Sequence, residues 1–266
     1  MLKFFSKLRW IYYITSILGA IIIFCVLMWL NIAGGISSAG PLASFWILAC
    51  ALFFHSQGRK KMEQIFRYRE LCQVKKYVSC LEKLLGETKS KKARDSLNIY
   101  LSAGYIDLGN PKKSLDLISD ICPEDFNGRT KINDKIVYYN SLVSACIMLG
   151  KFQEAQAALR NMKSAIESPK LSAIHRNAYL KHWKTKGVLL DIEEGKVAGA
   201  EEHLLRELDA ERSLLGKTSL CFRLGKLYLL LDDIEEASLY FTYAAENGGD
   251  TFYAKDAQRK LKILEE

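Results

Sequence analysis

Three histidines in the second half of the chain are the first candidates for a metal-binding or catalytic site. His175 and His182 are seven residues apart, so they would share one face of a helix, and His203 follows further along the chain. Imidazole is a common zinc ligand, but neither a carboxylate at ligand spacing nor a His-x-x-x-His pair accompanies these residues. We therefore interpret them as surface or packing histidines and predict no bound metal.

An acidic cluster is the next candidate, because paired carboxylates can act as general acid and general base. The cluster lies at a predicted turn and in the first turn of the helix that follows, and it consists of Asp232, Asp233, Glu235 and Glu236. Carboxylates in that position accept hydrogen bonds from free N–H groups and interact favourably with the helix dipole. The spacing therefore favours helix capping over catalysis.

The seven cysteines form no Cys-x-x-Cys pair, and their spacing is irregular. Such a pattern is typical of reduced, mostly buried thiols in a reducing compartment. A cysteine nucleophile with a histidine partner stays open, but nothing in the sequence singles out one cysteine. Gly-rich phosphate loops, Gly-x-Ser-x-Gly and His-Glu-x-x-His are absent from the sequence as well. We predict that the protein is not an enzyme and binds no cofactor.

The 266-residue chain carries a formal net charge of +8, a value that invites a nucleic-acid interpretation. The charge is unevenly placed. The first 70 residues hold eight bases and two acids, whereas the rest of the chain is close to neutral at +2. Because binding to nucleic acid depends on many phosphate contacts by Lys and Arg, we expect no nucleic-acid partner for the larger part of the chain.

The N-terminal bases flank an apolar stretch with no charged residue, which runs from Trp10 to Leu30. As a helix these residues would be about 32 Å long, enough for a hydrocarbon core of about 30 Å. The stretch is longer than the apolar region of a secretory signal peptide. Aromatic residues lie near both of its ends, as they do at membrane interfaces. The sequence predicts a first transmembrane span over residues 10–30.

A second apolar stretch follows a small-residue loop and predicts a second span over residues 36–55. Its strongly apolar part is short, so a re-entrant or interfacial segment is the alternative. Bases precede the first stretch and follow the second, while the loop between them carries no charge. The positive-inside rule then places both termini in the cytoplasm. We predict a two-helix membrane anchor over residues 1–58.

Two other interpretations apply to this region. The bases that follow the second stretch could bind anionic lipid headgroups, although membrane topology alone explains them. The two apolar stretches could instead be core helices of a soluble fold, but uncharged runs of this length rarely occur in soluble helices.

Residues 59–266 show a different pattern, in which apolar residues recur at steps of three and four. Hairpin turn signals and strand-type alternation are scarce, so we predict an all-α domain. Helix–turn–helix units recur along it, with turns near Lys75, Gly109, Gly150, Gly195 and Asp232. The best unit contains Leu224-Gly225, Tyr228, Ala237, Phe241 and Ala244. This pattern resembles the tetratricopeptide repeat (TPR), whose period is 34 residues, and the resemblance covers about residues 61–247.

The resemblance implies an α-solenoid of antiparallel helix pairs whose first helices line a concave groove. That groove would grip a protein or peptide partner, and it would be lined by Ser96, Ile99, Ala103, Asn140, Ser144, Ile147, Phe222 and Lys226. The groove lacks the aligned Lys, Arg and Asn residues of a clamp for acidic peptides. The last helix, about residues 251–264, is predicted to be a polar cap.

These observations lead to one functional hypothesis and two alternatives. The first is a membrane-anchored, non-catalytic scaffold whose cytoplasmic array recruits a protein partner, with lipids around the N-terminal hairpin. The second is an accessory subunit of a larger membrane complex, in which small residues of the hairpin pack against other spans. The third, less favoured, is an enzyme built on a helical-repeat frame.

Overall fold

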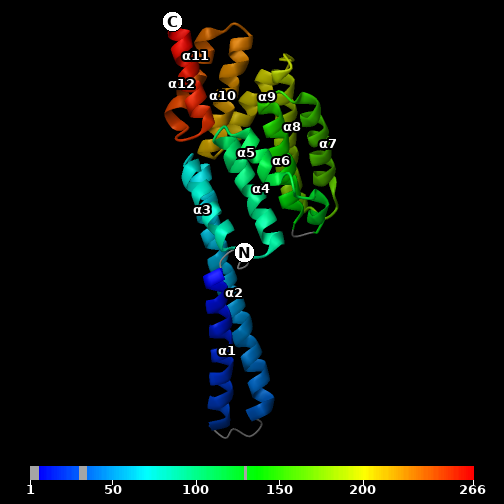
Figure 1. Ribbon diagram of the computed structural model, residues 1–266, viewed down its shortest axis with the longest axis vertical. Coiled ribbons are helices and arrows are strands. Elements are labelled where there is room, and N and C mark those ends of the chain that lie inside the picture. Colours follow the sequence, from blue (N-terminus) through cyan, green and yellow to red (C-terminus); the bar gives the residue numbers. More distant parts are fainter. Residues whose placement is uncertain (1–5, 30–34, 129–130) are drawn as a thin grey trace. The chain divides into compact units, whose positions relative to one another are not determined.

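The computed structural model describes residues 6–29, 35–128 and 131–266, with side chains from residue 8 in the first range and from residue 40 in the second (Figure 1). Throughout these residues the regular structure is helical and no strand is present, which confirms the all-α prediction. The helices are α1 Ser6–Trp29, α2 Gly35–Glu70, α3 Val74–Glu87, α4 Lys91–Asp107, α5 Pro111–Ile118, the 3-10 helix η2 Pro123–Phe126, α6 Ile132–Met148, α7 Phe152–Glu167, α8 Ala173–Glu193, α9 Ala200–Ala210, α10 Leu214–Leu230, α11 Ile234–Asn247 and α12 Phe252–Glu265.

Two compact units divide the chain. The first unit contains residues 1–66 and 83–94, and the second, which we call the helical array, contains residues 67–82 and 95–266. The boundary after residue 66 lies inside α2, which continues without a break from Gly35 to Glu70. Part of the predicted anchor lies outside the described residues, namely Lys3, Leu30 and the loop residues 31–34.

Within the first unit, α1 packs antiparallel against the N-terminal half of α2. Tyr12 contacts Phe54 with ring centroids 5.9 Å apart, and the Trp46 indole N–H donates a hydrogen bond of 3.2 Å to the Thr15 carbonyl oxygen. Gly19 provides the room for this indole, since a Cβ atom on Gly19 would lie 1.9 Å from Trp46 Nε1. The glycine therefore allows the close approach of the two helices.

The surface of α1 is apolar and exposed. Among the described residues one helix, Leu8–Trp29, is long and apolar enough to cross a membrane, and almost none of it is buried. Trp10, Ile17 and Ile22 each expose more than half of their area. The predicted second span lies within α2 and does not meet the same criterion over its described residues.

In the helical array, consecutive helices pack against one another, as in the pairs α6–α7 and α10–α11. The predicted turns between paired helices fall where expected. Gly109 and Gly150 follow α4 and α6 with φ of 79° and 70°, the left-handed conformation that glycine adopts without strain. Asp233 accepts a hydrogen bond from the Glu236 N–H at 3.1 Å and so caps α11, which confirms the capping role predicted for the acidic cluster.

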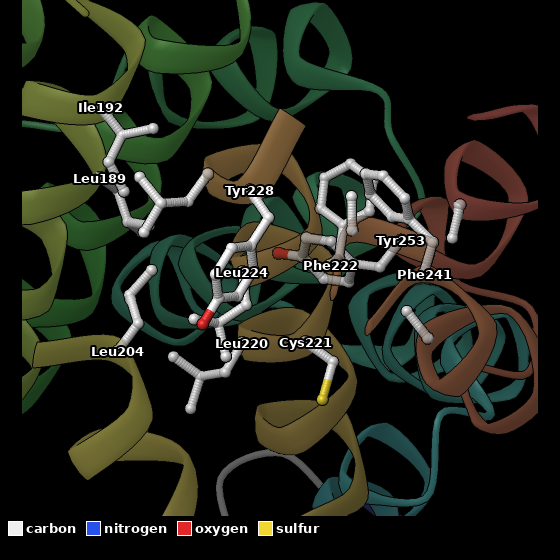
Figure 2. Packing of buried hydrophobic residues seen from close by; sticks show 14 of the residues in the cluster. Leu189, Ile192, Leu204, Leu220, Cys221, Phe222, Leu224, Tyr228, Phe241 and Tyr253 are labelled. Carbon is white, nitrogen blue, oxygen red and sulfur yellow. The ribbon is translucent and has the colours of Figure 1, made fainter. Parts of the chain in front are cut away.

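The largest apolar cluster of the array joins α8, α9, α10, α11 and α12 (Figure 2). Phe222 and Phe241 lie in its centre with ring centroids 5.9 Å apart. Small residues allow the helices to approach closely: Ala237 and Ala244 are fully buried, and a Cβ atom on Gly225 would lie 2.7 Å from the Phe241 ring. These are the residues that carried the resemblance to the tetratricopeptide repeat.

The last helix differs from the polar cap that the sequence suggested. One face of α12 is buried in the core through Tyr253, Ala254 and Ala257. The turn before it reaches the start of the array, where Asp250 accepts hydrogen bonds from the N–H groups of Val74 at 2.6 Å and Lys75 at 3.0 Å. The two ends of the array are therefore joined through these hydrogen bonds.

Candidate functional site

A cavity of about 430 Å³ lies within the helical array. The helices α4, α6, α8 and α10 line it, together with Arg69 at the end of α2 and Tyr253 at the start of α12. Its volume is in the range of about 300–1,000 Å³ that ligand pockets usually have. Each of the four helices contributes two residues four positions apart: Ala103 and Asp107, Asn140 and Ser144, His182 and Lys186, and Ser219 and Arg223.

Three of the eight residues predicted to line the groove lie at this cavity: Ala103, Asn140 and Ser144. Two others on the same helices have packing roles. Ile99 is fully buried against Ile118 and Phe126, and Ile147 packs on the cluster around Ala155. Ser96 donates a hydrogen bond to Asp134 at 2.9 Å.

The remaining two predicted residues lie on α10 and do not line the cavity. Phe222 is 4% exposed and packs among the aromatic rings of α11 and α12, and Lys226 forms an ion pair with Glu193. The side of α10 that lines the cavity is instead the one that carries Ser219 and Arg223. The repeat register therefore selected residues of α10 that do not line this cavity.

Arg69 and Asp107 form an ion pair at the cavity wall, with Arg69 Nε 2.6 Å from Asp107 Oδ2. The Asp107 side chain is almost completely buried. Burial by itself would lower the pKa of Arg69, but the nearby carboxylate outweighs burial and raises this pKa above its ordinary value. Arg69 therefore stays charged, and Asp107 compensates its charge.

Lys186 has a different environment. Its ammonium group donates a hydrogen bond to the Ser144 hydroxyl oxygen at 2.6 Å. The residue as a whole is only partly buried, but burial of the ammonium group is the main influence on its acidity. Burial, and after it the positive charge of Arg223, lower the pKa of Lys186 to about 7, while Asp107 acts in the opposite direction. Lys186 is therefore only partly charged at neutral pH.

Arg223 also has a hydroxyl partner instead of a carboxylate. It donates a hydrogen bond of 2.5 Å to the Ser219 hydroxyl oxygen, and its guanidinium carbon lies 5.6 Å from the centre of the Tyr253 ring. The other acids at the cavity have partners of their own. Glu207 pairs with Lys181 at 3.2 Å, and Glu211 accepts hydrogen bonds of 2.8 Å from the N–H groups of Arg212 and Ser213.

Sequence reasoning missed Arg69, Lys186 and Arg223. Cavity-lining residues recur four positions apart on α8 and α10, as Lys186 does with His182 and Arg223 with Ser219. This spacing alone does not single them out, because Phe222 and Lys226 are also four residues apart and do not line the cavity. Arg69 gives no such signal, because the sequence shows it only as one of the bases that follow the second apolar stretch.

The three histidines in the second half of the chain are not brought together on one site. His182 lines the cavity, His203 Nε2 lies 3.1 Å from the Thr185 hydroxyl oxygen, and His175 lies in the first turn of α8. Over the residues that the structure describes, no group of three or more His, Cys, Asp and Glu side chains could hold a metal ion.

Comparison with known proteins gives no relative from which a function could be transferred. No family model matches the chain, and no curated protein or solved structure matches it either. The function is therefore inferred from the residues and the geometry of this chain.

Proposed function

We propose that the protein is a non-catalytic scaffold, held in a membrane by its N-terminal hairpin, that presents the helical array to a protein partner in the cytoplasm. The observation that carries this proposal is the exposed apolar surface of α1, which has a stable environment only in contact with lipid or with other apolar segments. Anchoring would raise the local concentration of the partner at the membrane.

The proposal includes a second span in α2 and a cytoplasmic location for both termini. The antiparallel contacts of Tyr12 with Phe54 and of Thr15 with Trp46 support a hairpin, because they run along both helices. Phe45 and Leu52 of α2 are as exposed as the residues of α1. The bases that follow, Arg59 among them, support a cytoplasmic end.

The proposal also includes a TPR-like α-solenoid. It is supported by the antiparallel helix pairs, by the glycine turns and by the fully buried Ala237 and Ala244 on the second helix of the last pair. The array departs from an open solenoid in one respect, because Asp250 connects its end to its beginning. A folded partner domain is too large for a cavity of about 430 Å³, so it has to bind on the outside.

An exposed apolar patch offers such an outside surface. Leu230, Leu231 and Ile234 lie around the turn between α10 and α11, and their exposed fractions are 53%, 43% and 48%. Apolar side chains gathered at one place on a surface are typical of sites that contact other proteins. We assign the protein partner to this patch and expect no contact with nucleic acid.

The absence of catalysis in this proposal is supported by the state of the buried thiols. Burial raises the pKa of Cys72, Cys146 and Cys221, the last to about 11. A thiol with such a pKa is protonated at neutral pH and is a poor nucleophile.

The experiment for this proposal is affinity capture of the full-length chain from detergent-solubilised membranes. We expect one protein to be recovered in stoichiometric amount, and the double variant Leu231→Asp/Ile234→Asp to lose it. The control is Ile263→Asp, which places one such charge on another exposed apolar residue, on α12. Recovery of no protein above background, or equal recovery by both variants, would contradict the scaffold proposal.

A further inference from the structure

Two cations at the cavity have no acidic partner. Lys186 and Arg223 donate their hydrogen bonds to the hydroxyl groups of Ser144 and Ser219, and no carboxylate of the described residues lies within ion-pair distance of either. The other two cations of the wall, Arg69 and Lys181, are each paired with an acid. A buried charge without a counter-charge is costly, so this arrangement favours an anion from outside.

The charged groups that face Lys186 come from several helices. The positive charges of Arg223 on α10 and Arg69 on α2 lower the pKa of Lys186, and the negative charge of Asp107 on α4 raises it. His182, one turn earlier on α8, is in turn influenced by the charge of Lys186. Because Asp107 is already paired with Arg69, the balance around Lys186 is positive, and a negative group next to it would be stabilised.

The rest of the cavity sets the kind of molecule that fits. The hydroxyl group of Ser219 and the amide of Asn140 can donate hydrogen bonds to acidic oxygen atoms, whereas the Ser144 hydroxyl already donates to the Asn140 carbonyl oxygen at 2.8 Å. Ile136, Val137 and Leu215 provide an apolar wall. The volume of about 430 Å³ suits a small molecule.

We propose that this cavity binds a small organic molecule with two negative charges, held between Lys186 and Arg223. Such a ligand would carry either a phosphate monoester or two carboxylates, since both present acidic oxygen atoms that a lysine and an arginine can bind. This inference goes beyond the scaffold proposal and does not depend on it, because the cavity and the apolar patch share no residue.

Binding should also change the protonation of the site. Lys186 titrates near pH 7 in the empty cavity, and an adjacent dianion would raise its pKa. At neutral pH the protein should therefore take up protons when the ligand binds. A dicarboxylate is already fully ionised at neutral pH, so one that contacted only Arg223, which is charged at every accessible pH, would leave the proton balance unchanged.

The test uses the full-length chain in detergent micelles at pH 7, with thermal unfolding and titration calorimetry as readouts. The probes are inorganic phosphate, glucose 6-phosphate and succinate, with glucose and sodium chloride of matched ionic strength as controls. We expect at least one dianion to bind with a 1:1 stoichiometry and to raise the unfolding temperature. For succinate, which is already a dianion at pH 7, the binding heat should also differ between buffers of different ionisation enthalpy, which reports proton uptake by the protein.

The three probes distinguish a phosphate ligand from a dicarboxylate ligand. Binding of glucose 6-phosphate or phosphate assigns a phosphate ligand, and binding of succinate alone assigns a dicarboxylate. If none of the three stabilises the protein more than sodium chloride does, the proposal is overturned.

Matched variants assign the binding to the two cations. Lys186→Met and Arg223→Gln should each weaken binding by about tenfold or more, the usual effect of losing a charged hydrogen bond. Lys184→Met, an exposed lysine on the same helix outside the cavity, should bind as the unaltered chain does. Binding that survives Lys186→Met would overturn the proposal, and protein capture through the patch would be unaffected by that result.

Discussion

Lys186 is a base whose environment in the folded protein differs strongly from that in the unfolded chain. Burial, and after it Arg223, lower its pKa from 10.5 to about 7 on folding. Between these two pH values the unfolded chain binds more protons than the folded protein, so Lys186 makes stability rise with pH from about 7 to 10.5. Below pH 7 both states are protonated, and the full cost of burying the charge is present.

Replacing Lys186 with methionine should therefore stabilise the protein in a pH-dependent manner. We expect the free energy of unfolding to increase by about 2–4 kcal/mol at pH 6 and by progressively less as the pH approaches 10. Urea unfolding of both proteins at pH 6 and pH 9 measures this difference. A gain of equal size at both pH values would show that Lys186 is not buried as a charge.

Asp107 represents the opposite case, a buried acid with a partner. Replacing Asp107 with asparagine leaves Arg69 without its counter-charge, so we expect a loss of about 3–5 kcal/mol in the free energy of unfolding. The matched control is Asp256→Asn, which breaks the exposed pair with Arg259 and should cost about 0.5 kcal/mol or less. Equal losses in the two variants, measured by urea unfolding, would contradict the buried ion pair.

At the scale of the helices, the sequence was most informative where local chemistry decides the structure. The glycine turns after α4 and α6 and the cap at Asp233 depend on residues next to them, and they were predicted correctly. The side of α10 that faces the cavity depends on how α11 and α12 pack, and periodicity alone does not contain that information. Of the residues predicted for the groove, Asn140 and Ser144 line the cavity, whereas Phe222 packs in the core.

The joined ends of the array could not be predicted from the sequence either. Asp250 and the N–H groups of Val74 and Lys75 are separated by about 175 residues, and no local pattern connects them. The polar residues of α12 suggested a solvated cap, but its three small or aromatic residues Tyr253, Ala254 and Ala257 form a buried face. Short apolar stripes of this kind are easily overlooked in a helix that is polar elsewhere.

At the scale of the helices, the contact of Asp250 with the start of α3 can be tested. Because its carboxylate caps α3 from the far end of the chain, Asp250→Ala should lower the free energy of unfolding by about 1–2 kcal/mol. Hydrogen exchange should accelerate at the amides of Val74 and Lys75 while those of α7 keep their protection. Unchanged exchange at the two amides would show that the ends of the array are not joined through Asp250.

At the scale of the whole molecule, the chain combines an apolar helix, Leu8–Trp29, with a helical array that encloses a cavity. The positions of the bases indicate that both termini lie in the cytoplasm. This orientation and the second span are both proposals. A partner at the patch and a dianion in the cavity would give the array two separate contacts. A scaffold with a ligand site of this kind could change its partner binding with the level of the ligand.

The central claim is that the array lies on the cytoplasmic side of a membrane that holds the hairpin. The most direct measurement is a topology reporter fused after Glu266, with alkaline phosphatase and a green fluorescent protein compared in separate fusions. We expect a fluorescent fusion that stays with the membranes after an alkaline wash, and an inactive phosphatase fusion. An active phosphatase fusion would contradict the orientation, and release of the fluorescent fusion by the wash would contradict the anchor.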